Sequence, residues 1–365
     1  MGNPRRKRTQ ITTQCAGGEE EVDRLSNLPD EIIHHILSFL DDTPSAVKTC
    51  VLSKRWKHLW TSIPDLSFHH VNWAFLIHTF LRRDPNTKLH SLRLYICSDY
   101  ALYSGVDGVA LRNWAVDNAV RYGVRHIDLY HRDYIDRCPV PSALLGCRTL
   151  KTLTLRHLDV SDLLLSSSCF GGVTDLCLED CVFNGCFCVS GIFPNVVNLR
   201  LLHLEVVNGV MEVSGTLQLV YLDMVGLVCD KVKLSAPNLR GFRYSDNGSV
   251  INDFFDIDLP SLRRAEVLLY EDGKADRVFK LLYGIRSVES LAISIGTLEA
   301  LDKARLLKHQ TSSFSKLTFL KLLVSPNKCR RVVRKEIKAY LLSGTPRSQR
   351  VDVVVDRLPY YPAED

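Results

Sequence analysis

Cysteines are the residues of this sequence best suited to metal or redox chemistry, and four of them lie close together. They are Cys177, Cys181, Cys186 and Cys188. Zinc sites usually use cysteine pairs separated by two residues, and this run contains no such pair. The run reads as a strand and a turn, with Cys177 on the exposed side of the strand. We therefore expect the four thiols to point apart, and predict no metal site and no cofactor.

Other catalytic signatures are missing from the sequence. It has no glycine loop that could cradle a phosphate, no His-Glu-x-x-His helix and no nucleophile elbow. We expect His34 and His35, on the first predicted helix, to be solvated or to face a partner. These patterns predict that the chain is not an enzyme.

Charge and composition narrow the class of protein. Hydrophobic residues make up 46% and charged residues 24% of the sequence, which is typical of an ordinary globular protein. Four of the five net positive charges lie in the run Arg5–Arg8, so the rest is nearly neutral and nucleic-acid binding is not favoured. The run itself is either a nuclear localisation signal or a solvated terminus.

The N-terminal sequence also bears on the cellular compartment. It lacks the apolar core of a secretory signal, and no stretch approaches the ~18 apolar residues of a membrane-spanning helix. The twelve cysteines are therefore expected to be reduced. We expect a protein of the nucleus, the cytoplasm or both, with no membrane contact.

Three short helices are predicted between residues 23 and 68. Pro29 suits the first turn of the first helix, whose apolar residues recur every four positions at Ile32, Ile36 and Leu40. Thr43 and Pro44 begin a second helix.

In the third helix, Trp56, Leu59 and Trp60 share one face, while Lys54, Arg55 and Lys57 form a solvated one. So small a unit has too little interior to bury two tryptophans with these aliphatic residues, which implies a partner surface.

The two segments LPDEIIHHILSFL (28–40) and CVLSKRWKHLW (50–60) resemble a plant-type F-box. The resemblance implies docking on the Skp-type adaptor of a cullin-containing ubiquitin ligase. It assigns to docking, or to the small core of the motif, the positions Leu28, Pro29, Ile32, Ile36, Val47, Val51, Leu52 and Trp56. A DNA-reading helix-turn-helix is the alternative, but such a helix presents polar side chains to base edges, and this third helix carries two tryptophans.

The rest of the chain repeats an apolar-x-x-apolar-x-apolar pattern. Its middle residues are Leu92, Ile127, Leu153, Leu176, Leu199, Leu222, Phe242, Ala265, Leu291 and Leu320. Most steps between them fall within the ~20 to 29 residues typical of leucine-rich repeats. Alternation within each copy predicts a strand, and the period predicts parallel stacking in an α/β solenoid.

The array resembles irregular plant leucine-rich repeats that follow an F-box, with loops or short helices on the convex side. Cys181 occupies the position at which many such repeats have Asn or Cys, whose side chain satisfies backbone polar groups in the turn. Leu111, Ala115 and Ala119 predict an extra helix before the second strand.

The C-terminal segment is predicted to hold a helix and a final strand. Val333, Ile337, Tyr340 and Leu341 form a helical face, and Val351–Val353 a strand. This end weakly resembles the FBD segment of some plant F-box proteins.

The middle position of each strand should face the concave surface. Four successive strands carry charges of alternating sign there, and a fifth charge lies further on: Arg200, Asp223, Arg243, Glu266 and Lys321. Neighbouring strands lie about 4.8 Å apart, so these side chains can interact. They are either an exposed, self-paired ladder of little energetic value or a recognition face for a protein target.

The sequence thus predicts five parts: a tail (1–22), an F-box (23–68), a helical linker with a first irregular repeat (69–123), leucine-rich repeats (124–325) and a helix-strand cap (326–365). The function expected from the resemblance is target recognition for an SCF-type ubiquitin ligase. The second hypothesis is a protein-interaction scaffold of the same fold that works outside a ligase. The third is a protein that binds nucleic acid through its basic tail.

Overall fold

The computed structural model divides the chain into two compact units, Met1–Ile63 and Pro64–Asp365, called here the N-terminal unit and the repeat unit. The residues that it describes are 25, 27–40, 42–69, 72–97, 107–132, 137–165, 170–246, 250–269, 275–298, 314–324, 341–342 and 352–357. The predicted basic tail, and most of the predicted C-terminal helix, lie outside these residues. Among the described helices, none is long and apolar enough to cross a bilayer.

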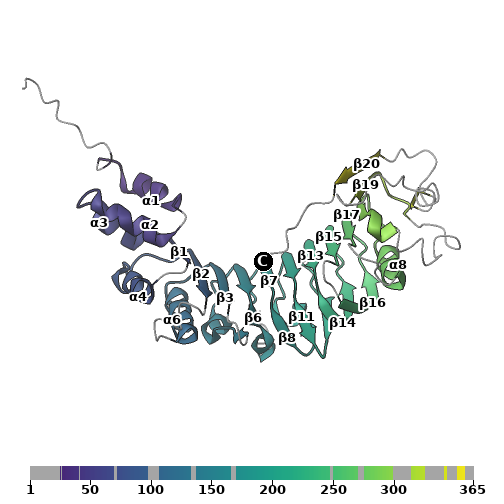
Figure 1. The fold of residues 1–365 in the computed structure, drawn as a ribbon, viewed down its shortest axis with the longest axis horizontal. Helices are drawn as coiled ribbons and strands as arrows, with labels where there is room; N and C mark the ends of the chain where they lie inside the picture. Colours follow the sequence, from purple (N-terminus) through teal and green to yellow (C-terminus); the bar gives the residue numbers. More distant parts are fainter. Residues whose placement is uncertain are drawn as a thin grey trace, which may run out of the picture. The chain divides into compact units, whose positions relative to one another are not determined.

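The N-terminal unit is helical (Figure 1). Its elements are α1 (Asp30–Ser38), α2 (Thr43–Lys48), the 3-10 turn η1 (Thr49–Val51), α3 (Trp56–Leu59) and the 3-10 turn η2 (Trp60–Ser62). Asp42, rather than Thr43, caps α2, because its Oδ1 accepts the amide hydrogen of Ser45 at 2.8 Å.

The repeat unit is built on a parallel sheet of twelve strands. In spatial order they are β1 (Asp65–His69), β2 (Ser91–Cys97), β3 (His126–Arg132), β5 (Thr152–Arg156), β7 (Asp175–Glu179), β10 (Asn198–Leu202), β13 (Tyr221–Val225), β15 (Gly241–Ser245), β17 (Arg264–Leu268), β18 (Ser290–Ser294), β19 (Phe319–Val324) and β20 (Asp352–Arg357). All ten strands predicted from the repeating pattern are present and parallel, which confirms the solenoid. The sheet begins with β1, most of which lies within the predicted F-box segment, and extends through β20 into the predicted cap.

A second parallel sheet runs alongside the first (Figure 1). Its strands are β4 (Cys138–Pro139), β6 (Leu158–Asp159), β8 (Val182–Asn184), β11 (Glu205–Val207), β14 (Val228–Ser235), β12 (Val210–Ser214) and β9 (Phe187–Cys188), with β16 (Val250–Asp258) paired to β14. The expected convex side of loops and short helices is therefore wrong over much of the array. Most of these strands are short, so they leave little periodic signal in the sequence.

A tight turn joins the two sheets in each central repeat. The residue after the first strand takes a left-handed conformation, with φ of 57° at His157, 49° at Asp180, 51° at His203 and 62° at Gly226. The amide of each donates to the carbonyl of the next repeat, as from His157 to Glu179 (3.0 Å). The Cys181 sulfur lies 3.3 Å from the carbonyl oxygens of Leu155 and Glu179, as expected for a residue that satisfies turn backbone.

Helices complete the repeat unit. They are α4 (Trp73–Arg82), α6 (Gly108–Arg121), the 3-10 turns η3 (Ser142–Gly146) and η4 (Ser161–Leu165), α7 (Val189–Ile192) and α8 (Ala275–Gly284). The helix predicted from Leu111, Ala115 and Ala119 is α6, and all three side chains are buried. The core of the unit consists of the repeating leucines, of which Leu153, Leu155, Leu199 and Leu201 are fully buried.

Candidate functional site

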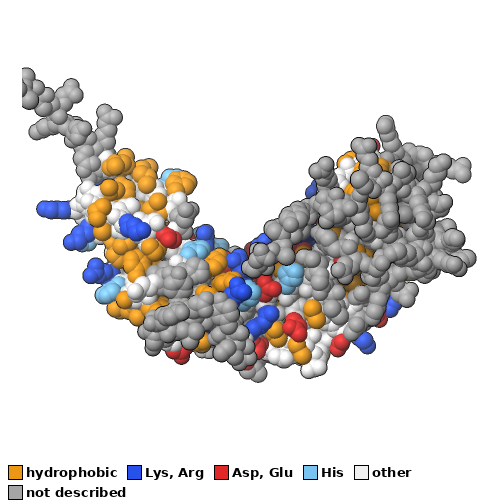
Figure 2. Space-filling view, viewed as in Figure 1, with side chains coloured by type: hydrophobic (Ala, Val, Ile, Leu, Met, Phe, Trp, Pro, Cys, Tyr) orange, Lys and Arg blue, Asp and Glu red, His pale blue; other side chains and the backbone are white. Residues whose placement is uncertain are grey.

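An exposed apolar surface lies on the N-terminal unit. It is formed by residues of α1 and η1 and by residues directly after them, and its members are Ile32, Ile36, Phe39, Leu40, Val51 and Leu52. We call it the apolar face. Phe39 is 72% exposed and Val51 is 83% exposed. Figure 2 shows hydrophobic side chains gathered over this unit. Clustered exposed apolar side chains are typical of surfaces that bind a partner.

The helix α1 is apolar on two sides, which explains how one short element serves both core and surface. Ile33 and Leu37 are buried, whereas Ile32 and Ile36 point outward. Residues four apart lie one above the other on a helix, so each pair forms its own stripe. The apolar residues of this helix therefore form two stripes with different roles.

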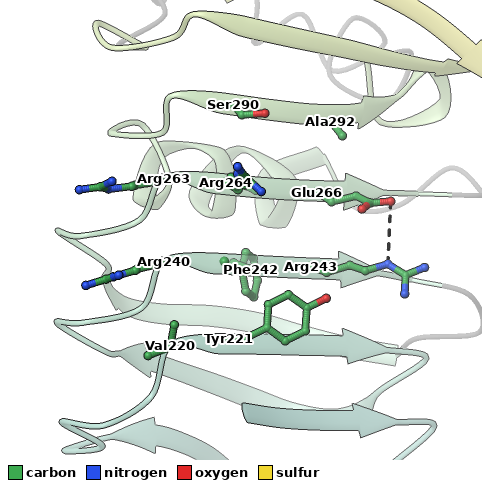
Figure 3. A pocket seen from close by; sticks show the side chains of 12 residues that line it. Val220, Tyr221, Arg240, Phe242, Arg243, Arg263, Arg264, Glu266, Ser290 and Ala292 are labelled. Atoms are coloured by element: carbon green, nitrogen blue, oxygen red, sulfur yellow. Dashed lines mark ion pairs between the residues drawn. The ribbon is translucent and has the colours of Figure 1, made fainter. Parts of the chain in front are cut away.

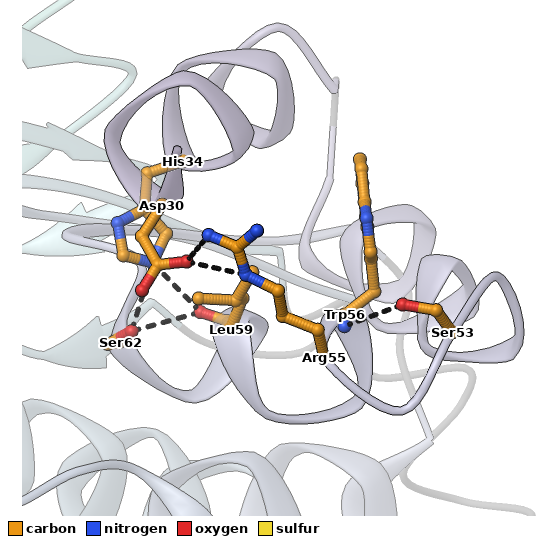
Figure 4. A network of polar contacts seen from close by, with 7 residues as sticks. All are labelled: Asp30, His34, Ser53, Arg55, Trp56, Leu59 and Ser62. Carbon is orange, nitrogen blue, oxygen red and sulfur yellow. Dashed lines mark hydrogen bonds and ion pairs between the residues drawn. The ribbon is translucent and has the colours of Figure 1, made fainter. Parts of the chain in front are cut away.

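Polar contacts fix α1 against the segment after α2 (Figure 4). His34 Nε2 lies 3.2 Å from the Leu59 carbonyl and 3.0 Å from the Ser62 hydroxyl. Arg55 Nε donates to Asp30 Oδ1 at 2.9 Å, and its Nη2 also contacts that oxygen. The expectations of a solvated or partner-facing His34 and a merely solvated Arg55 are therefore wrong.

The structure places the eight predicted adaptor-binding residues in three environments. Pro29, Ile32, Ile36, Val51 and Leu52 are exposed. Leu28 and Val47 are half-buried, and Trp56 is only 2% exposed. Trp56 therefore belongs to the core. The assignment of the others to adaptor docking stays a prediction.

The expectation that the two tryptophans are too large for the interior is wrong. Trp56 and Trp60 are both buried, so they are not what a partner would cover. The exposed apolar area comes instead from aliphatic residues and from Phe39, which the sequence analysis did not select. Phe39 follows Ile36 by three positions, and that spacing could have identified it.

The charged middle residues of the predicted strands lie side by side in the twelve-stranded sheet. The register pairs Arg200 with Asp223, Asp223 with Arg243, and Arg243 with Glu266. We call this side of the sheet the ladder face. Arg243 Nη1 lies 3.4 Å from Asp223 Oδ2, and Arg243 Nε lies 3.8 Å from Glu266 Oε1. Lys321 pairs with Asp356 of β20 at 2.9 Å.

One alternative predicted from the sequence is an exposed, self-paired row of charges. The centre of the row is buried instead. Asp223 is only 6% exposed, and burial raises the pKa of its carboxyl, opposed by the nearby charges of Arg243 and Arg200. A buried carboxylate depends on its partner far more than a surface one does.

Replacement of Arg243 by Ala should lower the free energy of unfolding by about 2 kcal/mol, because the buried Asp223 carboxylate loses its partner. Adding Asp223→Asn should recover most of that loss, since a neutral amide needs no counter-charge. Urea unfolding of the wild type, both single variants and the double variant measures the coupling. Additive losses would contradict this account.

The pH dependence of the Arg243→Ala variant follows from the same geometry. The pKa of Asp223 is already raised in the folded state, so the folded chain binds more protons than the unfolded chain between the two pKa values. The contribution of Asp223 to the free energy of unfolding therefore rises as the pH falls through the pKa that its carboxyl has in the folded chain. The deficit of the variant should shrink as the pH is lowered from 7 in the same urea measurement.

The ladder face carries a second polar network, which the sequence did not predict. The Tyr95 hydroxyl donates to Asp128 Oδ2 at 3.0 Å, and Arg156 Nη1 donates to that hydroxyl at 3.2 Å. Arg156 Nε lies 3.0 Å from Glu179 Oε2, and the His69 ring stacks on Tyr95 with centroids 4.2 Å apart. Tyr95, Arg156 and Glu179 directly follow the repeating pattern and share one register position on β2, β5 and β7, with Tyr130 of β3 between Tyr95 and Arg156. That shared position was the available signal.

Comparison with known proteins bears on both units. The F-box domain model matches residues 25–67, which contain every described helix of the N-terminal unit. An F-box/FBD/LRR-repeat protein of Arabidopsis thaliana is 28% identical over 352 residues, covering 84% of this chain and 70% of that protein. The chain contains an F-box domain and is similar to F-box/LRR-repeat proteins. F-box/LRR-repeat protein 25 of the same plant is 27% identical over 243 residues, 62% of this chain and 86% of the relative. Another Arabidopsis F-box/LRR-repeat protein is 27% identical over 363 residues, 92% of this chain and 71% of the relative.

The cysteines of the chain lie in contrasting environments. Cys177 is buried, which corrects its expected exposure, and burial raises its pKa to about 11. Burial also raises the pKa of Cys181 and of Cys229 to about 12 each, whereas Cys186 is exposed. Among the described residues, no group of three or more His, Cys, Asp or Glu side chains is placed to hold a metal ion.

Thiol labelling should therefore separate these cysteines. Iodoacetamide at pH 8 should modify Cys186 at least about 100-fold faster than Cys181 or Cys229, because the thiolate is the reactive species and burial suppresses it. Time-resolved peptide mass spectrometry gives the rates, with urea-unfolded chain as the control in which the three should converge. Equal rates in the folded chain would contradict the burial of Cys181 and Cys229.

Proposed function

We propose that the chain is the substrate-recognition subunit of an SCF-type E3 ubiquitin ligase. The observation that carries the proposal is the apolar face of the F-box, whose outward residues include Ile32, Ile36 and Val51. F-box domains generally bind Skp-type adaptors, and this chain has such a domain. Burial of these side chains against an adaptor would remove them from water, which supplies the driving force for docking.

The leucine-rich repeats supply the other half of the function. Through the adaptor the F-box reaches a cullin, and the ladder face binds a protein target. Arg200, Asp223, Arg243, Glu266 and Lys321 are the residues proposed for that contact, and Arg200 is the most exposed of them. Asp223 and Arg243 serve mainly to hold the charged row in place, because they are mostly buried and paired.

The chain transfers no ubiquitin in this proposal. It raises the effective concentration of target lysines near the ubiquitin-carrying enzyme by holding target and adaptor on one chain. The expected compartments are the nucleus and the cytoplasm.

Assembly with purified partners tests the proposal. The full chain should co-elute with a Skp-type adaptor and a cullin in size-exclusion chromatography. A variant with Leu28→Ala and Pro29→Ala should elute alone while keeping its circular dichroism spectrum. A folded wild-type chain that never joins the adaptor would overturn the ligase assignment and leave an interaction scaffold of the same fold.

A further inference from the structure

A hollow of about 540 Å³ opens on the ladder face where β13, β15 and β17 begin (Figure 3). Tyr221, Gly241 and Arg264 occupy the same register position on these three strands. Gly241 has no side chain, and a Cβ there would lie 2.9 Å from the Tyr221 ring. The missing side chain and the leaning ring together shape the hollow, whose volume lies within the ~300 to 1,000 Å³ of ligand sites.

Three exposed arginines gather at the N-terminal edge of the hollow. Arg240 and Arg263 precede β15 and β17 at equivalent positions, since the Arg263 amide donates to the Arg240 carbonyl at 3.0 Å. Arg264 is the next residue, and Figure 3 shows Arg240 and Arg263 extending in the same direction. Within the part of the chain that the structure describes, none of the three forms an ion pair.

Nearby acids do not neutralise this cluster. Glu266 and Asp223 interact with Arg243, further along the strands. Glu289 precedes β18 beside Arg263, but the described residues contain no ion pair between them. Like charges on adjacent strands, about 4.8 Å apart, repel one another. An anionic ligand would relieve that repulsion.

We propose that this hollow binds an acidic segment of the target protein, with carboxylates on Arg240, Arg263 and Arg264 and an apolar contact on Tyr221. The planar guanidinium group matches a carboxylate with two parallel hydrogen bonds, and an aromatic ring beside it receives the neighbouring side chain. This inference rests on the proposed function, because it names the chemistry of the target that the repeats recognise. The sequence did not predict this cluster, because Arg240 lies 23 positions before Arg263 and comes beside it only when β15 and β17 pair.

Peptide binding by the full chain tests the inference. The probe is a fluorescent peptide of about ten residues in which glutamate alternates with alanine, long enough to cross the hollow at about 3.3 Å per residue. A second peptide carries glutamine in place of each glutamate. The glutamate peptide should bind and the glutamine peptide should not, as measured by fluorescence anisotropy at physiological ionic strength.

Two matched variants locate the site. Arg263→Glu with Arg264→Glu should weaken binding of the glutamate peptide at least about tenfold, because two attractive contacts become repulsive. Arg125→Glu with Lys151→Glu makes the same change in net charge, at exposed residues that precede β3 and β5 and lie outside the hollow. That control should stay within about twofold of the wild type.

Equal losses in the two variants, or no binding by the folded wild type, would overturn the inference. Binding of inorganic pyrophosphate at the arginines without binding of the glutamate peptide would also overturn it. Co-elution with the Skp-type adaptor, measured on the same preparations, is expected to be unchanged in both variants. A folded wild type that binds the adaptor but not the glutamate peptide therefore counts against the hollow alone. A folded wild type that fails to bind the adaptor counts against the proposed function.

Discussion

The double substitution Ile32→Asp and Ile36→Asp should weaken binding of a Skp-type adaptor at least about 100-fold. Burial of one such side chain contributes about 1.5–3 kcal/mol, and about 1.4 kcal/mol corresponds to a factor of ten in affinity. Each introduced carboxylate would also have to leave water when the adaptor docks. Both positions are exposed, so the substitutions should leave the fold intact. Titration calorimetry gives the affinity, and circular dichroism checks the fold.

Two controls bracket that result. Leu81→Asp with Leu217→Asp adds the same charge at two exposed leucines of the repeat unit, and adaptor affinity should be unchanged. Ile33→Asp, on the buried stripe of α1, should unfold the N-terminal unit. If the outward pair lost no affinity while the fold persisted, the apolar face would not be the docking surface.

The substitution Phe183→Ala should lower the free energy of unfolding of the repeat unit by about 3–5 kcal/mol. Phe183 lies on β8 of the second sheet, is fully buried, and meets the Phe187 ring edge-on with centroids 4.7 Å apart. Truncation of the ring leaves a cavity, which the closely packed neighbouring side chains cannot fill. Guanidinium unfolding followed by circular dichroism measures the effect.

The matched comparison for Phe183 is an exposed position of the same unit. Leu217 is 63% exposed, and Leu217→Ala should change stability by no more than about 0.5 kcal/mol. Repeat arrays can unfold in parts, so hydrogen exchange of β6 and β11, the neighbours of β8, should report the same loss locally. Equal effects of the two substitutions would contradict a core between the two sheets.

Much of the fold could be predicted because leucine-rich repeats leave a signal at every copy. Leu153 and Leu155, for example, alternate with polar residues and recur with a fixed period, so both the strand and its parallel neighbour follow from the sequence. The second sheet could not be predicted in the same way. Strands such as Leu158–Asp159 are too short for alternation to be visible, and they form because left-handed turns such as His157 redirect the chain.

The candidate sites were predicted less completely, for a similar reason. The stripes of α1 were visible as apolar residues, but which of Ile32 and Ile33 faces outward depends on how α1 packs in the folded unit. On the ladder face, the pairing of Arg243 with Asp223 followed from the register, whereas the burial of Asp223 did not. Arg240 and Arg263 are 23 positions apart, and only the strand pairing brings them together.

The most direct measurement of the central claim is hydrogen exchange of the full chain with and without a purified Skp-type adaptor. We expect adaptor binding to slow exchange in residues 30–40 and 49–52, which carry the apolar face, and to leave β13, β15 and β17 unchanged. Binding that protects the repeat strands but not those two segments would contradict the account.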